Sequence, residues 1–324
     1  MKDIISTWER RCFDGKGIDK EDAFIVLSMP DDWLFDLLGA TWRIRKRWKG
    51  DNISLCSIIN AKSGQCSEDC SFCAQSRISK ADIKIYPLMD PEEIYRSAID
   101  AMAAGAVRFS IVTSGKGIKG EKEINILSKA IEAISNLGLE PCASIGIVDE
   151  KTLSFLKNHG LKRFHHNLET SRSYFTNVCT THSYDEDIMV LKKAKDIGLK
   201  ICCGGIFGLG ESDDHRVELA MTIRDLEVDS IPINFLHPIK GTKLEGLDKL
   251  SPLECIRIIS MMRLTNPTKD IIICGGREVN LRDLQNLIFP AGANGLMIGN
   301  YLTTPGRSPE EDLIMLRDLC LKGT

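Results

Sequence analysis

The sequence lacks the features of a membrane-bound or nucleic-acid-binding protein. It has no run of about 18 apolar residues that could span a bilayer, and its charged start, MKDIISTWERRCFDG, lacks the apolar segment of a secretory signal. Its 42 Lys and Arg residues are balanced by 45 Asp and Glu residues, so the net charge of -3 provides no broad basic surface. We therefore expect a cytoplasmic protein that binds neither membranes nor nucleic acid.

Disorder is excluded as well, because 43% of the 324 residues are hydrophobic and can bury a core. What the chain does contain is cysteine, with twelve residues of this type. In a reducing compartment, cysteines are more often metal ligands or small buried side chains than disulfide partners. The twelve cysteines are therefore the first candidates for a functional site.

From about residue 50 onward, a short apolar and β-branched run is followed repeatedly by a turn and an amphipathic segment of helical period. Eight such units occur at a mean spacing of roughly 35 residues, which is typical of an eightfold barrel. The predicted strands are residues 53–60, 107–114, 139–146, 162–169, 199–206, 230–236, 270–276 and 294–300.

This alternation predicts an α/β fold, a (β/α)8 TIM-type barrel, with an open doubly wound sheet as the alternative. Residues 1–49 carry a helical pattern with all four tryptophans and predict an N-terminal helical extension, so that the barrel occupies residues 50–324. Helix boundaries are visible too. Asp90 and Pro91 form a typical helix start, and Gly105, Gly138 and their later counterparts mark helix ends before the next strand.

Cys66, Cys70 and Cys73 follow the first predicted strand in the segment AKSGQCSEDCSFCAQS. In a barrel, the loops at the carboxyl ends of the strands carry the chemistry. The C-x3-C-x2-C spacing favours an iron–sulfur cluster, because soft thiolates select it and three ligands leave one iron open to bind something else. Zinc is the alternative, but structural zinc sites need four ligands.

The cysteine triplet resembles the cluster loop of the radical S-adenosylmethionine (SAM) superfamily. The segments CSEDCSFCAQS, FHHNLETS, ICCGGIFGLGES, SIPINFLHPIKGT, GGRE and AGANGLMIGNYLTTPG are similar, in the same order, to the biotin synthase family. The resemblance implies a 4Fe-4S cluster that binds SAM, a 5′-deoxyadenosyl radical, and sulfur insertion between carbons 6 and 9 of dethiobiotin. It also implies a flavodoxin or ferredoxin as electron donor, and a homodimer.

In KRFHHNLETS, strand alternation places His165, Asn167 and Glu169 on one face, and His166 and Leu168 on the other. A polar triplet that faces a barrel interior needs hydrogen-bond partners, and a polar ligand can supply them. An internal polar network is the alternative. The resemblance implies that Asn167 and Glu169 bind the SAM ribose and that His165 approaches the dethiobiotin ring, although the family usually has Asn and Asp where this chain has His165 and Glu169.

The resemblance assigns further residues to the two ligands. Asn234, expected on the same side as Pro232, would hold the ureido ring, since a primary amide can both donate and accept hydrogen bonds. Five more residues are assigned to SAM from the cysteine loop, the end of the second strand and a glycine-rich turn. They are Phe72, Thr113, Ser114, Gly208 and Gly210.

The resemblance also implies an auxiliary cluster as the sulfur donor, but this chain departs from the familiar ligand pattern of three cysteines and one arginine. Cys142 and Cys202 match two of the cysteines, whereas Ser110 and Ile272 replace the third cysteine and the arginine. An isoleucine cannot ligate iron, and a serine oxygen is a hard ligand that is rare for it.

Cys56 and Cys274 suggest a replacement. Together with Cys142 and Cys202 they come from predicted strands one, three, five and seven, and alternate barrel strands contribute the four side chains of one interior layer. We therefore predict an auxiliary cluster held by these four cysteines, of the 4Fe type, with 2Fe-2S as the alternative. A buried small hydrophobe is the alternative for each cysteine.

Cys179, in a predicted loop, is the alternative fourth ligand of the auxiliary cluster, and its role and that of His182 are left open. The remaining cysteines are expected to be structural; they are Cys12, Cys203, Cys255 and Cys320. Other functions stay open at this point. These are a related radical SAM enzyme of the hydrogenase-cofactor maturase type, a non-catalytic iron–sulfur redox or scaffold protein, and a zinc-binding barrel.

Overall fold

The computed structural model describes all 324 residues and contains ten strands. The strands are β1 (Asn52–Lys62), β2 (Arg108–Thr113), β3 (Glu140–Ser144), β4 (Arg163–His165), β5 (Lys200–Cys202), β6 (Gly205–Phe207), β7 (Ser230–Phe235), β8 (Asp270–Ile273), β9 (Gly295–Met297) and β10 (Lys322–Gly323). All strand pairs are parallel, in the order β1, β2, β3, β4, β5, β7, β8 and β9, with β6 beside β7 and β10 beside β1.

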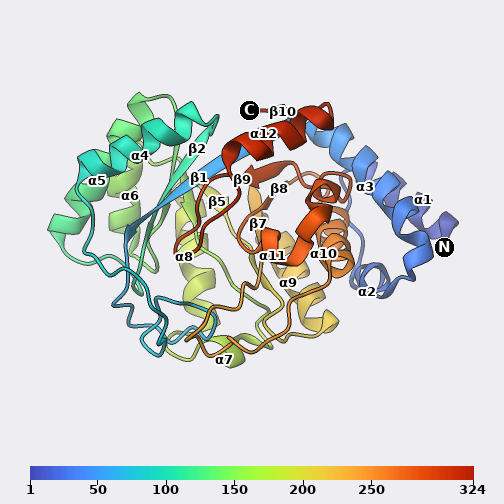
Figure 1. Cartoon of the computed structure of the whole chain (residues 1–324), viewed down its shortest axis with the longest axis horizontal. Coiled ribbons are helices and arrows are strands. Elements are labelled where there is room, and N and C mark those ends of the chain that lie inside the picture. The colour runs from blue at the N-terminus through green and yellow to red at the C-terminus, as the bar shows by residue number, and fades with distance from the viewer.

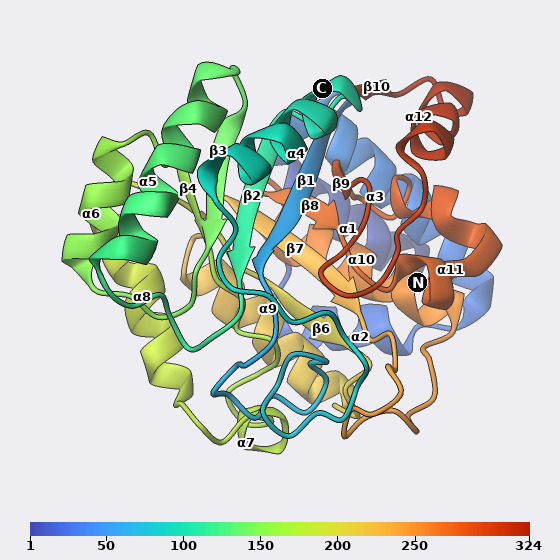
Figure 2. The same ribbon diagram turned by 60° about the vertical axis from the view of Figure 1, so that its left-hand side comes forward.

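The sheet closes on itself, because β1 pairs with β9 as well as with β2. This closure confirms the predicted eightfold barrel and excludes the open doubly wound sheet. Helices surround the strands, and the loops that follow the carboxyl ends of the strands gather at one end of the barrel, at the bottom of Figures 1 and 2. That end also holds the short helix α7 (Phe175–Val178).

The other helices are α1 (Lys2–Phe13), α2 (Lys20–Ser28), η1 (Asp31–Trp33), α3 (Leu34–Lys49), α4 (Pro91–Ala103), α5 (Glu121–Asn136), α6 (Glu150–Asn158), α8 (Tyr184–Asp196), α9 (Asp213–Asp225), α10 (Pro252–Thr265), α11 (Arg277–Leu281), η2 (Arg282–Ile288) and α12 (Pro309–Asp318). The predicted start of α4 is confirmed, with Asp90 as N-cap in a capping box with Glu93 and Pro91 at the first position. Gly105 and Gly138 have positive φ after their helices, as predicted for helix ends.

Most predicted strands are shorter in the structure than expected, and two of them are interrupted. The segment 199–206 divides into β5 and β6, because the chain at Gly204 passes so close to Pro232 that a Cβ would lie 1.9 Å from the carbonyl oxygen of that residue. Pro232 also lacks the N–H that a continuous ladder would need. The segment 162–169 forms the three-residue β4 and then a single parallel bridge between Glu169 and Gly205.

The N-terminal helices pack on one side of the barrel, where α3 and α2 contact α10 and α2 also contacts α9. One cluster of 72 buried residues includes Ile5 and Leu37 of these helices together with the barrel core. The division into residues 1–49 and 50–324 stays a prediction, although β1 begins close to the predicted boundary. None of the helices has the length and apolar character needed to span a membrane.

Candidate iron–sulfur and substrate site

The three cysteines of the C-x3-C-x2-C motif lie on the long loop between β1 and α4, at the carboxyl end of the barrel (Figure 2). A side chain at the end of β2 and another within the loop fix the start of this loop. The Ser114 hydroxyl donates to the Gly64 carbonyl at 2.6 Å, and the Gly64 N–H donates to Gln75 Oε1 at 3.0 Å. Cys66, Cys70 and Cys73 all line one cavity of about 220 Å³, here called the loop cavity.

Several residues that were predicted to bind SAM line the loop cavity next to the cysteines. Thr113 at the end of β2 and the adjacent Ser114 are both 8% exposed, and Phe72 lines the cavity from the cysteine loop. Gly208 and Gly210 line neither this cavity nor the second cavity, inside the ring of strands, that is described next. Their positive φ values of 94° and 96° serve the turn between β6 and α9, so their assignment to SAM stays a prediction.

A second cavity of about 300 Å³, here called the barrel cavity, lies inside the ring of strands. His165, Asn167 and Glu169 line both cavities, so the two adjoin along the end of β4. This confirms the predicted common face of these three side chains. Leu168 points away and is fully buried in the core, as predicted. His166, expected on the face of Leu168, lines the loop cavity but not the barrel cavity, because Asp187 holds its Nε2 at 2.7 Å.

The shared wall is electrostatically unusual. Burial raises the pKa of the Glu169 carboxyl to about 7 and lowers the pKa of the His165 imidazole to about 4. His165 Nδ1 lies 3.3 Å from Cys202 Sγ, and Asn167 Nδ2 donates to Glu169 Oε2 at 3.3 Å. The wall therefore presents a neutral imidazole and a carboxyl group that titrates near neutral pH.

The barrel cavity brings together all four cysteines of the predicted auxiliary site. Cys56, Cys142, Cys202 and Cys274 line it from β1, β3, β5 and the residue just after β8. Cys274 lies one position beyond the strand, but its N–H still donates to the Ile233 carbonyl at 2.9 Å. The parity argument therefore predicted the inward orientation of all four side chains.

The four thiols are buried, so a thiolate formed at any of them needs a positive charge nearby. Burial raises the pKa of Cys56 to about 11, and it raises the pKa values of Cys142, Cys202 and Cys274 too. Metal coordination overcomes such a shift, because a bound cation deprotonates the thiol outright. Ser110 and Ile272 line the same cavity, so they stand where the familiar ligands are expected but offer no soft donor atom.

Asn234 on β7 lines the barrel cavity on the same side as Pro232, as predicted. Its Oδ1 accepts from the Gly275 N–H at 3.0 Å, and its Nδ2 donates to the Gly205 carbonyl at 3.3 Å. A primary amide has two N–H donors and two lone pairs. One donor and one acceptor therefore remain for a ligand, and both are held in a fixed orientation by the backbone.

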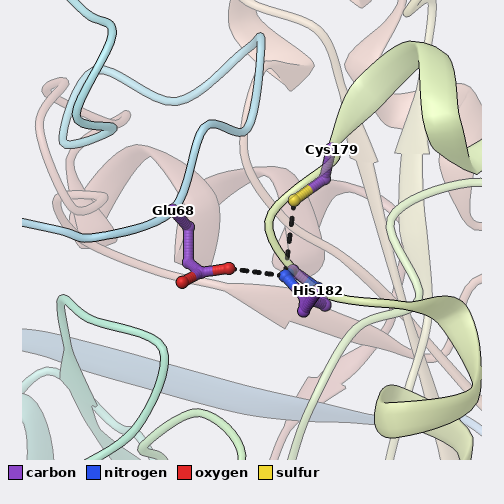
Figure 3. A group of neighbouring side chains, drawn as sticks. All are labelled: Glu68, Cys179 and His182. Atoms are coloured by element: carbon purple, nitrogen blue, oxygen red, sulfur yellow. Dashed lines mark hydrogen bonds and ion pairs between the residues drawn. The ribbon is translucent and has the colours of Figure 1, made fainter.

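Cys179 and His182 form a cluster with Glu68 of the cysteine loop (Figure 3). His182 Nδ1 lies 2.7 Å from Glu68 Oε2 and 3.3 Å from Cys179 Sγ, and its Nε2 lies 3.3 Å from Asp187 Oδ2. Burial alone would lower the pKa of His182, but its hydrogen bonds to these partners raise it to about 11. The imidazolium thus joins the cysteine loop to α8.

The position of Cys179 corrects one prediction. Cys179 lines the loop cavity and not the barrel cavity, so it is not an alternative ligand at the auxiliary site. Its hydrogen bond with Cys70 lowers its pKa to about 4, which places it against the first set of cysteines. The four cysteines expected to be structural line neither cavity; they are Cys12, Cys203, Cys255 and Cys320.

Sequence reasoning missed two arginines of the barrel cavity, Arg108 and Arg163, at the starts of β2 and β4. Arg108 Nη1 is buried and has no hydrogen-bond partner, and the same holds for Ser110 Oγ. The strand period could have found Arg108, which shares the parity of Ser110. Sequence reasoning also missed Glu68, although its position between Cys66 and Cys70 could have marked it as part of the site.

The donor sets fit iron–sulfur clusters at both cavities. At the loop cavity the three thiols of the C-x3-C-x2-C motif match a cluster with one open iron, while a fourth thiol there, Cys179, is paired with His182 and Asp69. The four thiols at the barrel cavity match an all-cysteine cluster. The unpartnered Arg108 Nη1 is a hydrogen-bond donor that still needs an acceptor inside the barrel cavity.

A closed parallel barrel with three cysteines on the loop after its first strand defines the class of the radical SAM enzymes. The model of the Radical SAM superfamily matches residues 62–223, and that of the Biotin and Thiamin Synthesis associated domain matches residues 232–322. A protein named biotin synthase from Geotalea daltonii is 50% identical over 322 residues, 99% of this chain and 98% of that protein. The chain belongs to the biotin synthase family.

Other comparisons agree with this assignment. Biotin synthase from Geobacter sulfurreducens is 50% identical over 96% of this chain and 95% of its own length. Among solved structures, methylornithine synthase has a TM-score of 0.84 at 21% identity, covering 98% of this chain and 97% of its own. The FeFe-hydrogenase maturase HydG from Carboxydothermus hydrogenoformans has a TM-score of 0.81 at 18% identity, covering 99% of this chain and 79% of its own. At these identities the two structures show a shared fold only.

Proposed function

We propose that this enzyme converts dethiobiotin to biotin by radical SAM chemistry. The observation that carries the proposal is the pair of adjoining cavities, each lined by its own set of cysteines and both bounded by His165, Asn167 and Glu169. Such a shared wall would bring a radical generated in one cavity next to a substrate bound in the other. Placement of this kind is the main contribution of a protein to cofactor chemistry.

In the loop cavity, Cys66, Cys70 and Cys73 would hold the 4Fe-4S cluster, which leaves one iron for SAM. This cluster supplies the electron that cleaves SAM to methionine and a 5′-deoxyadenosyl radical. Thr113 and Ser114 border the same cavity at the end of β2, where they can contact the methionyl amine. Phe72 adds an apolar surface, and Asn167 and Glu169 offer an amide and a carboxyl group to the ribose hydroxyls.

In the barrel cavity, Asn234 has one amide donor and one acceptor left for a ligand, which matches the pairing needs of a cyclic urea. His165 stands on the shared wall, between the SAM side and the substrate. Its neutral imidazole, with a pKa lowered by burial, can approach the uncharged dethiobiotin ring without burying a charge beside it.

The sulfur donor of this proposal is an auxiliary iron–sulfur cluster held by Cys56, Cys142, Cys202 and Cys274. Four thiols from alternate strands of the barrel favour a 4Fe cluster, with 2Fe-2S as the alternative. Two C–H bonds of dethiobiotin must be broken for two C–S bonds to form. Because each deoxyadenosyl radical removes one hydrogen, two SAM molecules are consumed for each biotin. A flavodoxin or ferredoxin as electron donor, a homodimer and a cytoplasmic location complete the proposal.

The test is a turnover assay with the protein purified and reconstituted under argon. Incubated with SAM, a low-potential reductant and dethiobiotin deuterated at carbons 6 and 9, it should form biotin and about two 5′-deoxyadenosines per biotin. Mass spectrometry should find deuterium in the deoxyadenosine. An Asn234→Ala variant should still cleave SAM but form little biotin. Cleavage of SAM by the wild type without deuterium transfer from dethiobiotin would contradict the proposal.

A further inference from the structure

The floor of the barrel cavity is formed by two arginines that lie beside the cysteines of the auxiliary site. Arg108 is opposite Cys56 in the register of β1 and β2, and Arg163 is opposite Cys142 in the register of β3 and β4. Both side chains line the barrel cavity, and they are only 15% and 4% exposed. Their guanidinium groups are therefore buried charges directly next to the proposed ligands.

These arginines share too few carboxylates to be neutralised. Arg108 pairs with Asp270 at 3.1 Å and lies 3.8 Å from Glu140, and Arg163 pairs with Glu140 at 2.7 Å. Lys49 and Lys200 also pair with these same carboxylates, at 2.8 Å and 3.3 Å. Four cations thus meet two carboxylates, and of the two positive charges in excess one is carried by Lys200, whose side chain is 56% exposed to solvent. The other excess charge is uncompensated, which is costly where it is buried.

Arg108 also has an unused hydrogen-bond donor. Its Nη2 bonds to Asp270 at 3.1 Å, whereas its Nη1 is buried without a partner. By contrast, Arg163 donates from Nε to Glu140 and from Nη1 to Ser230. Since buried donors in native proteins almost always find an acceptor, the free N–H of Arg108 calls for one inside the cavity.

We propose that Arg108 and Arg163 form the cationic floor of the auxiliary cluster, and that the free Nη1–H of Arg108 donates a hydrogen bond to a sulfur of that cluster. The inference rests on the proposed auxiliary site. Four thiolates around a cubane or a 2Fe-2S core in its 2+ state carry a net charge of about -2, which the excess positive charge of the floor offsets in part. The floor would supply the positive charge that Ile272 cannot provide.

A hydrogen bond to a cluster sulfur and a nearby positive charge both favour the reduced, more negative form of the cluster. Arg108→Met keeps the length of the side chain but removes the charge and all donors. In an EPR-monitored redox titration of the reconstituted enzyme, the auxiliary signal is the one that SAM does not alter. We expect Arg108→Met to disfavour its reduction at least tenfold, which is a shift of about 59 mV to lower potential.

Arg216→Met is the matched control, because Arg216 is also largely buried and ion-paired, with Glu211, but lines neither cavity. It should leave the auxiliary potential unchanged. If Arg108→Met loses the auxiliary iron while the control and the radical cluster are retained, the inference also holds. An Arg108→Met protein with full auxiliary iron and an unchanged potential would overturn it.

If Arg108→Met does not fold, Arg108→Lys decides the question. The lysine keeps a positive charge near Asp270 but removes the free Nη1–H, so a lower auxiliary potential supports the inference and the wild-type potential overturns it. Wild-type enzyme that holds only the iron of the radical cluster would refute the auxiliary site and this inference together. A normal wild-type auxiliary signal that the Arg108 variants leave unchanged refutes the inference alone.

Discussion

Glu169 is an acidic side chain in an unfavourable position. Its backbone adopts a positive φ of 62°, which is uncommon for a residue other than glycine, and burial raises the pKa of its carboxyl group to about 7. The surrounding structure imposes this conformation, because the Glu169 carbonyl accepts from the Ile206 N–H at 2.8 Å and bridges to Gly205. Strain and desolvation at one residue are typical of a ligand site.

The first prediction concerns the pH dependence of SAM binding at Glu169. Below pH 7 the carboxyl is protonated, and above pH 7 it is ionised and accepts stronger hydrogen bonds from the ribose hydroxyls. The dissociation constant of SAM, measured by anaerobic equilibrium dialysis, should fall about tenfold between pH 6 and pH 8. Glu169→Gln should remove this dependence. The same pH profile in both proteins would exclude Glu169 from SAM binding.

At the residue scale, the sequence predicted the positions of the cysteines, which are rare residues with distinctive chemistry. Twelve cysteines could be sorted by spacing and strand parity, and the seven proposed ligands all line one of two cavities. Arg108 and Arg163 were missed because they are two of 42 basic residues; strand parity with Ser110 indicates that Arg108 points inward, but parity alone does not show that a cation at a strand start is buried. Their importance depends on Glu140 and Asp270, which only the closed barrel brings near them.

At the element scale, an ion-paired histidine is one of the contacts that hold the loop from β1 to α4 on the barrel, beside those of Ser114 and Asp69. His182 bonds to Glu68 of that loop (Figure 3). On its other side it lies 3.3 Å from Asp187 of α8, which also bonds to His166 after β4. The side chain of Asp187 is only 2% exposed. Its two histidine partners therefore connect the cysteine loop, α8 and the shared wall of the cavities.

The second prediction follows from the raised pKa of His182, about 11 in the folded protein against a usual value of about 6.5. Between these two values the folded state retains a proton that the unfolded state has lost. Stability should therefore fall as the pH rises above 6.5, by up to about 1.4 kcal/mol per pH unit. Thermal unfolding midpoints measured under argon between pH 6 and pH 9 should fall more steeply for the wild type than for His182→Gln.

His159→Gln is the control for this measurement, because His159 lies at the end of α6 and lines neither cavity. It should retain the wild-type slope. Parallel slopes for the wild type and His182→Gln would show that the imidazolium does not stabilise the loop. Sequence reasoning left His182 unassigned because Glu68, which it joins to α8, lies 114 residues earlier in the chain, and only the fold brings the two together.

The elements themselves were predictable where the period was long and regular. All eight strand segments were found, and the interruptions arise from contacts between strands that a single strand cannot reveal. The break between β5 and β6 depends on the close approach of Gly204 to Pro232, and β4 ends early as the chain turns toward Glu169. Both irregular segments border the barrel cavity, so the regular hydrogen bonding between neighbouring strands is interrupted beside the space for a ligand.

At the scale of the whole molecule, one barrel carries two cavities with separate ligand sets. The loop cavity takes the three cysteines of the motif from the loop after β1 and a fourth, Cys179, from the end of α7, whereas the barrel cavity takes one cysteine from each of four alternate strands. No cysteine lines both cavities. The closed fold is therefore a requirement for the auxiliary site, while the loop site depends mainly on local spacing and on the contacts of Ser114 and His182.

The last prediction is that the two clusters can be removed independently. The wild-type protein isolated under argon should hold about eight irons, and Cys56→Ala with Cys274→Ala should leave about four, with the SAM-dependent change of the reduced EPR spectrum intact. This double variant should cleave SAM but form no biotin. Replacement of Cys66, Cys70 and Cys73 by alanine should do the reverse, leaving an auxiliary Mössbauer signal without SAM cleavage. A double variant with full iron and full biotin yield would show that Cys56 and Cys274 are only packing residues, and the sulfur donor would have to be sought among the remaining ligands of the barrel cavity.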